Sequence, residues 1–148
     1  MRVLVINGPN LNMLGKRDVE HYGGDSLAAI EQKLIEKAKE LTCELAFFQS
    51  NHEGSLIDFI QENFAGADGI LINPGALTHY GYSLHDALLD SGLPVIEVHL
   101  SDIHTRENWR KVSVIADVTI RQITALKGQG YLLGLEDMVK YIRSREDK

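Results

Sequence analysis

The chain has 148 residues, 44% of them hydrophobic and 24% charged, which suits a globular protein with one hydrophobic core. Its formal net charge of −6 and the lack of a basic cluster beyond Lys16-Arg17 argue against nucleic acid or an anionic membrane as a partner. No apolar stretch is long enough to span a bilayer, no signal-peptide pattern opens the chain, and the single cysteine, Cys43, favours a reducing cytoplasm.

Predicted strands and helices alternate along the chain. Apolar residues three and four positions apart predict helices, whereas short apolar runs bounded by turn residues predict buried strands. Strands are expected at residues 2–7, 43–49, 69–72, 95–100 and near 119–126. Helices are expected at residues 27–41, within 50–64, at 83–89 and from 132 to about 143, the first of them capped by Asp25 or Ser26.

This alternation predicts an α/β fold: a flavodoxin-like, doubly wound three-layer sandwich with a five-stranded parallel sheet. We expect one domain over residues 1–148. Polar loops follow the first, third and fourth strands, at residues 7–23, 73–82 and 99–110. In such sheets ligands bind outside the carboxyl ends of the strands. The three loops therefore converge on one candidate site.

The first loop, "NGPNLNMLGKRDVEHYG", is about three times as long as most strand-to-helix connections. Tyr22 is a candidate base, and the guanidinium of Arg17, five residues earlier, would favour its phenolate form. Glycines flank both residues, which suits a lid over residues 15–25. The alternative is a mobile surface loop whose tyrosine packs on a neighbour.

Two further loops supply polar groups. Asn73 ends the third strand, and His79 lies within reach of the same edge; a turn with a surface histidine is the alternative. On the fourth strand, alternation places Glu97 and His99 on one face, where the carboxylate would orient the imidazole as a general acid. A purely structural Glu–His pair is the competing interpretation.

The residues after His99 offer groups for an anion. The backbone N–H groups of Leu100 and Ser101 could form a small cradle. Arg106 and Arg110, four residues apart, are expected on one face of a helix, although exposed arginines are usually only solvated.

Other chemistries find little support in the sequence. It contains neither a phosphate-loop lysine motif nor a GxGxxG fingerprint, and its six histidines lack a zinc-binding spacing. Ser101 lacks the nucleophile-elbow pattern, and Cys43 is expected to be a small core residue. We therefore expect no metal and no cofactor.

The motifs "INGPNLNMLGKR", "YG", "FFQSNHEGSLIDFI", "INPGALTHY" and "PVIEVHLSD", followed by two spaced arginines, together resemble the type II 3-dehydroquinate dehydratases of the shikimate or quinate pathway. The resemblance extends from Val3 to the final helix, essentially the whole chain. It implies a cytoplasmic, metal-free and imine-free lyase that removes water from 3-dehydroquinate, giving 3-dehydroshikimate through an enolate. It also implies a homododecamer built as a tetramer of trimers.

The resemblance assigns a role to each motif residue. Tyr22 would be the base, activated by Arg17, while Asn12 would hold a water that stabilises the enolate. His99, oriented by Glu97, would protonate the leaving hydroxyl. The substrate would be held by the following residues: Asn73, His79, Arg110, the amides of Leu100 and Ser101, and Asp86 from a neighbouring subunit.

Three departures from the family pattern stand out. Val19 stands in the lid where proline is common, which would leave the open lid looser. Asp102 replaces a usual asparagine and could weaken anion binding unless it points away. Gln122, Ala125 and Lys127 lie in a stretch where the family prefers glycines. The functional alternative is a non-catalytic small-molecule-binding module on the same fold.

Overall fold

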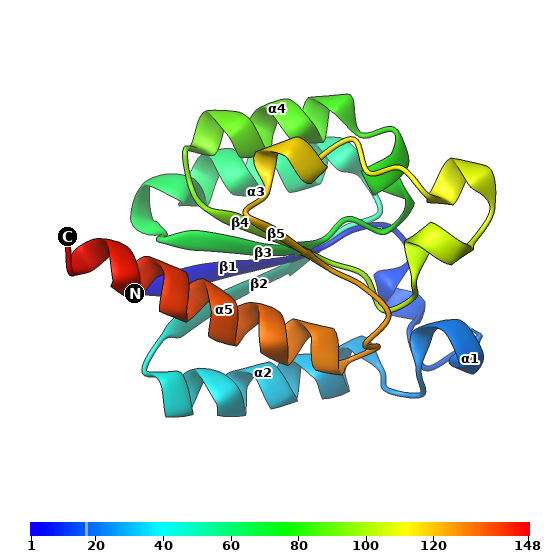
Figure 1. The fold of residues 1–148 in the computed structure, drawn as a ribbon, viewed down its shortest axis with the longest axis horizontal. Coiled ribbons are helices and arrows are strands. Elements are labelled where there is room, and N and C mark those ends of the chain that lie inside the picture. Colours follow the sequence, from blue (N-terminus) through cyan, green and yellow to red (C-terminus); the bar gives the residue numbers. More distant parts are fainter. Residues whose placement is uncertain (17) are drawn as a thin grey trace.

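Five parallel strands form the central sheet of the computed structural model, which describes residues 1–16 and 18–148. The strands are β1 (Arg2–Asn7), β2 (Glu44–Gln49), β3 (Gly69–Asn73), β4 (Val95–Val98) and β5 (Arg121–Ile123). Their order, β2-β1-β3-β4-β5, is that of flavodoxin-like sheets (Figure 1). This confirms the predicted fold. The proposed role of Arg17 lies outside the described residues.

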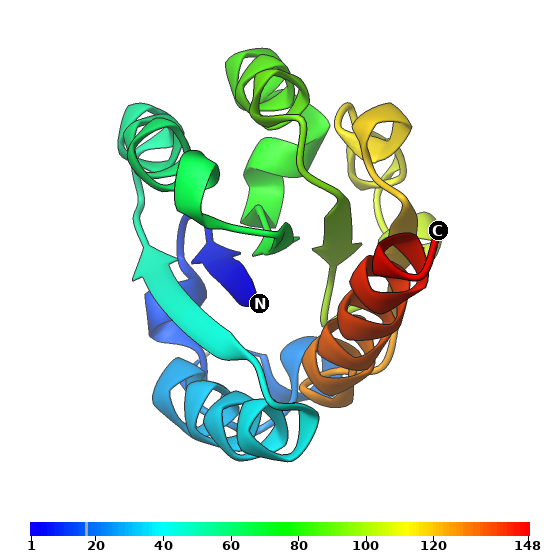
Figure 2. The same cartoon turned by 90° about the vertical axis from the view of Figure 1, so that its left-hand side faces the viewer.

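Helices cover both faces of this sheet, as Figures 1 and 2 show. The helices are α1 (Val19–Tyr22), α2 (Leu27–Leu41), α3 (Glu53–Asn63), α4 (Tyr82–Ser91) and α5 (Gln129–Glu146). Helices α2 and α5 pack on one face and α3 and α4 on the other, so that a separate apolar cluster fills each side. The short α1 lies apart from these layers, beyond the carboxyl edge of the sheet (Figure 1).

The sequence explains these layers directly. All five residues of β3 are buried, because a central parallel strand needs apolar side chains on both faces. Helix α2 begins where predicted: the side chain of Ser26 accepts a hydrogen bond from the Ala29 N–H, 3.1 Å away. Its buried residues, Ile30, Leu34 and Ala38, recur every four positions.

The segment after β4 differs from the prediction. Residues 106 and 110 do not share a helix, because two 3₁₀ turns, Ile103–Thr105 and Asn108–Arg110, replace it. Asp102 accepts a hydrogen bond from the His104 N–H at 3.0 Å, and this local turn competes with helix formation. Arg106 has extended backbone between the two turns.

Two glycines allow the loops after β1 and β3 to cross closely. A Cβ atom on Gly8 would lie 2.2 Å from the Pro74 carbonyl oxygen, and one on Gly75 would lie 2.8 Å from that of Pro9. Gly75 also has a positive φ of 60°, which favours glycine. The crossing brings both loops to the carboxyl edge of the sheet.

None of the helices in residues 1–16 and 18–148 has the length and apolar character needed to cross a membrane.

Candidate active site

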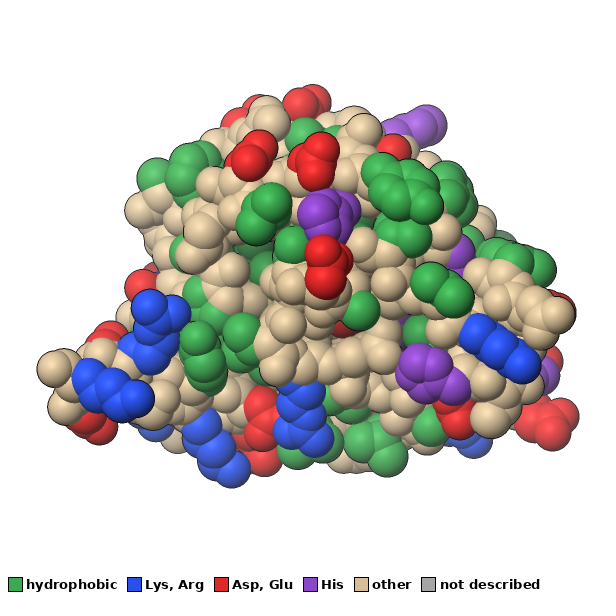
Figure 3. Space-filling view, turned by 45° about the horizontal axis from the view of Figure 1, so that its top comes forward, with side chains coloured by type: hydrophobic (Ala, Val, Ile, Leu, Met, Phe, Trp, Pro, Cys, Tyr) green, Lys and Arg blue, Asp and Glu red, His purple; other side chains and the backbone are tan. Residues whose placement is uncertain are grey.

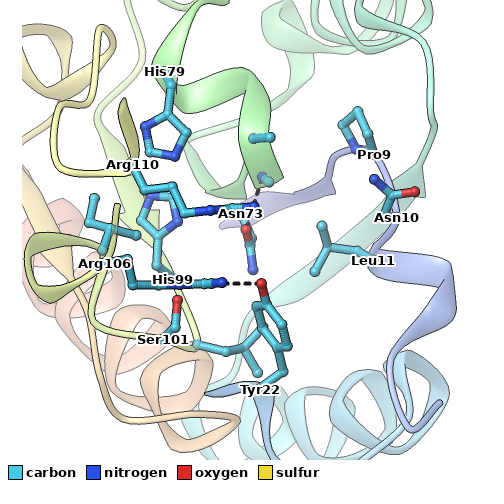
Figure 4. Close-up of a pocket in the computed structure, with 14 residues that line it drawn as sticks. Pro9, Asn10, Leu11, Tyr22, Asn73, His79, His99, Ser101, Arg106 and Arg110 are labelled. Carbon is cyan, nitrogen blue, oxygen red and sulfur yellow. Dashed lines mark hydrogen bonds between the residues drawn. The ribbon is translucent and has the colours of Figure 1, made fainter. Parts of the chain in front are cut away.

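A cavity of about 100 Å³ lies at the carboxyl edge of the sheet, where the predicted loops meet. In Figure 4, Pro9, Asn10 and Leu11 lie on one side of it, opposite His79, His99 and Arg110, while Tyr22 enters from the lid. The other lining residues are Asn73, Gly75, Ala76, Leu100, Ser101, Ile103 and Arg106.

Tyr22 occupies the end of α1 and closes one side of the cavity. Its hydroxyl oxygen accepts a hydrogen bond from Nη1 of Arg106 at 2.7 Å (Figure 4). The centre of the same guanidinium is 5.4 Å from the tyrosine ring centroid. The Arg106 side chain is only 15% exposed, so a largely buried cation lies against the phenol hydroxyl.

Glu97 and His99 form the predicted pair. His99 Nε2 lies 2.6 Å from Oε1 of Glu97, which is fully buried. Burial raises the pKa of Glu97, but the hydrogen bond and charge of His99 outweigh it and hold that pKa below its usual value. Because an ionised carboxylate only accepts hydrogen bonds, His99 must donate to it from Nε2. This contact fixes the orientation of the imidazole ring.

Hydroxyl groups also hold this carboxylate. Thr78 Oγ1 donates a short hydrogen bond to Glu97 Oε1, and Ser113 Oγ lies 2.9 Å from both carboxylate oxygens. A buried carboxylate without such donors would be costly. These donors allow Glu97 to remain charged inside the protein.

A second buried network supports Asn73. Its Nδ2 donates to the hydroxyl of Tyr131 at 3.0 Å, and its Oδ1 accepts from the Gly75 N–H at 3.1 Å. Tyr131 donates in turn to Asn7 Oδ1 at 2.6 Å, and burial raises the pKa of this fully buried tyrosine. The network fixes the Asn73 amide at the floor of the cavity.

The backbone after His99 is suited to an anion. Among the described residues, the N–H groups of Leu100 and Ser101 donate to no protein acceptor, while both residues are buried against the cavity. Their carbonyls are held from the other side, since Leu100 O accepts from Lys127 N at 3.0 Å and Ser101 O from Ala125 N at 3.1 Å. The cradle predicted from the sequence is therefore pre-oriented.

His79 and Arg110 complete the wall opposite Asn10. His79 Nδ1 lies 2.7 Å from the Val112 carbonyl, so it carries the proton and leaves Nε2 as an acceptor. Burial lowers the pKa of His79, which favours the neutral ring. The Arg110 guanidinium stacks 4.0 Å from the Trp109 ring centroid, and its Nε lies 3.0 Å from Glu107.

Several predicted residues lie elsewhere. Asn12 is exposed and does not line the cavity, whereas Asn10, two residues earlier, does. Asp86 lies on α4 with its side chain 74% exposed, outside the cavity. Asp102 points away from the cradle to cap the turn at His104.

The sequence assigns Arg106 little weight and favours Asn12 over Asn10. An arginine that is expected on an exposed helix is usually only solvated, and the sequence does not show that Arg106 meets Tyr22, 84 residues away. Asn10 adopts a left-handed φ of 70°, an unusual conformation that asparagine tolerates and that no spacing pattern reveals. The described residues contain no group of three His, Cys, Asp or Glu side chains placed to hold a metal ion.

Together the fold and the site define a flavodoxin-like α/β enzyme with an acid–base site, in which a tyrosine and a carboxylate-paired histidine face one small cavity. The sequence profile of the family "Dehydroquinase class II" matches residues 1–139, and the chain belongs to this family. The family predicted from the motifs is thus confirmed.

Named relatives and a solved structure support the same family. The chain is 53% identical to the 3-dehydroquinate dehydratase of Halothermothrix orenii, with 96% of each chain covered. It is also 53% identical to the 3-dehydroquinate dehydratase of Bacillus licheniformis, covering 90% of this chain and 92% of that protein. The crystal structure of the type II dehydroquinase from Butyrivibrio crossotus superimposes with a TM-score of 0.91 at 43% identity, covering 93% of this chain and 97% of that one.

Proposed function

We propose that this cavity catalyses the dehydration of 3-dehydroquinate to 3-dehydroshikimate, with residues 1–148 acting as one catalytic domain and residues 15–25 as its lid. The observation that carries the proposal is the meeting of Tyr22, next to Arg106, with the Glu97–His99 pair across one cavity. Removal of a proton beside a ketone and expulsion of a β-hydroxyl need a base and an acid, and these residues can supply both.

Proton abstraction is the task of Tyr22. As a phenolate, it takes the proton from the carbon next to the ketone, and the electron pair moves onto the carbonyl oxygen to give an enolate. Arg106 supports the phenolate through its hydrogen bond of 2.7 Å. Arg17, which the sequence assigned to the same task, is retained as a second cation of the lid.

Stabilisation of the enolate is assigned to Asn10 rather than to Asn12. Asn10 lines the cavity, whereas Asn12 is exposed outside it. The Asn10 N–H donates to the Asn51 side chain at 3.0 Å, which fixes the loop and leaves the Asn10 amide for a water at the enolate oxygen.

His99 acts as the general acid. As the enolate collapses, the carbon–oxygen bond breaks and the hydroxyl takes a proton from His99, so that water leaves. Glu97 orients the ring through its contact with Nε2. The proton gained by Tyr22 and the proton lost by His99 are exchanged with solvent, so the net products are 3-dehydroshikimate and water.

The remaining groups bind the substrate. The free N–H groups of Leu100 and Ser101 receive its carboxylate, which Arg106 and Arg110 attract. Asn73 binds a hydroxyl group, and His79 accepts from another through Nε2. Localised donors therefore hold an anion despite the net charge of −6.

Assembly into a homododecamer of four trimers, with Asp86 reaching a neighbouring site, is also proposed. Asp86 is exposed on α4, and the same part of the chain exposes Tyr80 to 59% and Tyr82 to 69%. On this face hydrophobic side chains adjoin acidic ones without a cluster of Lys or Arg (Figure 3). Contiguous exposed aromatic residues are suited to subunit contacts.

The lone Cys43 supports a cytoplasmic location.

The test is to add the purified protein to 3-dehydroquinate and follow the ultraviolet absorbance of the conjugated product. Parallel reactions contain a metal chelator or follow borohydride treatment, which would inactivate an enzyme that forms a lysine imine. We expect turnover in all three. A folded protein that binds 3-dehydroquinate without turnover would instead support the binding-module alternative.

A further inference from the structure

Gln122, on strand β5, contacts Glu97, the partner of the proposed general acid His99, from outside the cavity. In the sheet register its Cα pairs with that of Glu97, so both side chains lie on the same face of adjacent strands. Gln122 Nε2 donates to Glu97 Oε2 at 3.1 Å. Gln122 does not line the cavity, so any effect on the reaction passes through Glu97.

The two oxygens of Glu97 are held unequally. Oε1 receives the short hydrogen bond from Thr78 and the 2.6 Å contact of His99. Oε2 receives Gln122, while the single hydroxyl proton of Ser113 is shared between Oε1 and Oε2. Within residues 1–16 and 18–148, Gln122 is the donor that contacts Oε2 and not Oε1, and its loss would leave Oε2 with only its share of the Ser113 hydroxyl.

His104 holds the other end of the Gln122 amide. Its Nε2 lies 3.1 Å from Gln122 Oε1. Because the ionised Glu97 only accepts hydrogen bonds, it selects the amide orientation with NH₂ toward itself and oxygen toward His104. His104 must then donate from Nε2. Asp102 fixes the His104 backbone by capping its turn, so the exposed ring is held in place at the start of this chain of hydrogen bonds.

We propose that Gln122, supported by His104, is a positioning residue for the acid step: it holds the Glu97 carboxylate in the orientation that aims His99 at the leaving hydroxyl. This inference rests on the proposed function, because it requires Glu97 and His99 to form the acid pair. It also gives a structural role to Asp102 and Gln122, two of the residues at which the sequence departs from the family pattern.

The test replaces Gln122 by Met, which keeps the side-chain length but removes both hydrogen bonds. We expect Q122M to lower kcat by about tenfold with KM nearly unchanged, because a catalytic group displaced by a fraction of an ångström loses rate rather than binding. The matched control is Gln129→Met, since Gln129 is exposed at the start of α5 away from the cavity. That variant should keep the parent kcat.

A double-mutant cycle separates positioning from a general structural effect. His104→Phe should lower kcat by a smaller factor, and the Q122M/H104F pair should be no slower than Q122M alone, since both side chains act through one chain of contacts. Because His104 is exposed, this variant keeps the fold even where Q122M loses stability. Additive losses, or a Q122M kcat within about twofold of the parent, would overturn the inference.

Glu97→Gln distinguishes this failure from failure of the proposed function. If Glu97→Gln abolishes turnover while Q122M is unaffected, the acid pair stands and only the role of Gln122 is wrong. If Glu97→Gln keeps the parent kcat, the assignment of the acid pair itself is wrong, and the inference about Gln122 falls with it.

Discussion

Arg106 donates a hydrogen bond of 2.7 Å to the hydroxyl oxygen of Tyr22, joining the loop after β4 to the lid. The contact brings a guanidinium against the group proposed as the base, and in Figure 4 it lies at the edge of the cavity, below Asn73. One residue thus links α1 to the loop after β4 and places a positive charge beside the proposed base.

Replacing Arg106 by Met should therefore slow proton abstraction. Loss of the hydrogen bond and of the positive charge beside the proposed base is expected to lower kcat by about a hundredfold. Steady-state rates of product formation measure this, with Tm as the check on folding. Arg145→Met is the matched control, since Arg145 lies at the end of α5. A kcat within about twofold of the parent would contradict the role given to Arg106.

Replacing Tyr22 by Phe should abolish turnover with little change in fold. Tyr22 is only partly buried and belongs to the four-residue α1, so the ring can stay while the hydroxyl is lost. A general base contributes about 10²- to 10⁴-fold, which is the expected loss in kcat. The assay follows product absorbance, with Tm as the check on folding. Turnover within about tenfold of the parent would exclude Tyr22 as the base.

The fold was predictable because its signals are local. Apolar periodicity and the Ser26 cap predicted α2 at its observed bounds, and the apolar run predicted β1 at Arg2–Asn7. The error after β4 came from Asp102, whose side-chain hydrogen bond to the His104 N–H favours a turn over a helix. Sequence spacing alone does not reveal which backbone N–H will donate a hydrogen bond to such a side chain.

Contacts within the site were predictable only between residues that are close in sequence on one predicted strand. Alternation along β4 predicted the Glu97–His99 pair, now seen at 2.6 Å. The Arg106–Tyr22 contact depends on how two loops fold toward each other, and the choice between Asn10 and Asn12 depends on one left-handed residue. These features are set by tertiary structure, so no periodic pattern carries them.

Ala125→Gly should stabilise the protein. Ala125 has a φ of 68°, in the left-handed region that disfavours residues with a Cβ. Its side chain is exposed, so glycine relieves strain without loss of packing, and we expect the free energy of unfolding to rise by about 0.5 to 1 kcal/mol. Urea unfolding measures the change. Ala28→Gly, in the exposed part of α2, should have the opposite effect, and an Ala125→Gly variant less stable than the parent would disprove the strain.

Asp117→Asn should change how stability depends on pH. His85 lies 3.0 Å from Asp86 and 3.1 Å from Asp117, and hydrogen bonds to these two carboxylates raise the pKa of His85 above its ordinary 6.5. A raised folded-state pKa gives stability that is complete below 6.5 and is lost as the pH rises through the folded value.

Removal of the Asp117 charge should therefore lower Tm more at about pH 5 than at about pH 9, by a few degrees at most, because the contact is largely exposed. Thermal unfolding at both pH values is the measurement, and Asp90→Asn, an exposed change on α4, the helix that carries His85, is the control. An equal change at both pH values would show that protonated His85 does not depend on Asp117.

Asp86→Ala tests the proposed sharing of sites between subunits. The Asp86 side chain is 74% exposed and lies outside the cavity of its own chain, so its loss can reach the reaction only through a neighbouring copy. We expect a higher KM, because a polar contact to substrate is lost, together with a folded subunit whose Tm falls by no more than the few degrees expected for loss of an exposed contact to His85. Steady-state kinetics gives KM, thermal unfolding gives Tm, and light scattering on the same samples gives the size of the assembly. Asp90→Ala serves as the control on the same helix. A stable monomer with the parent kcat and KM would show that each chain works alone and that Asp86 has no part in catalysis.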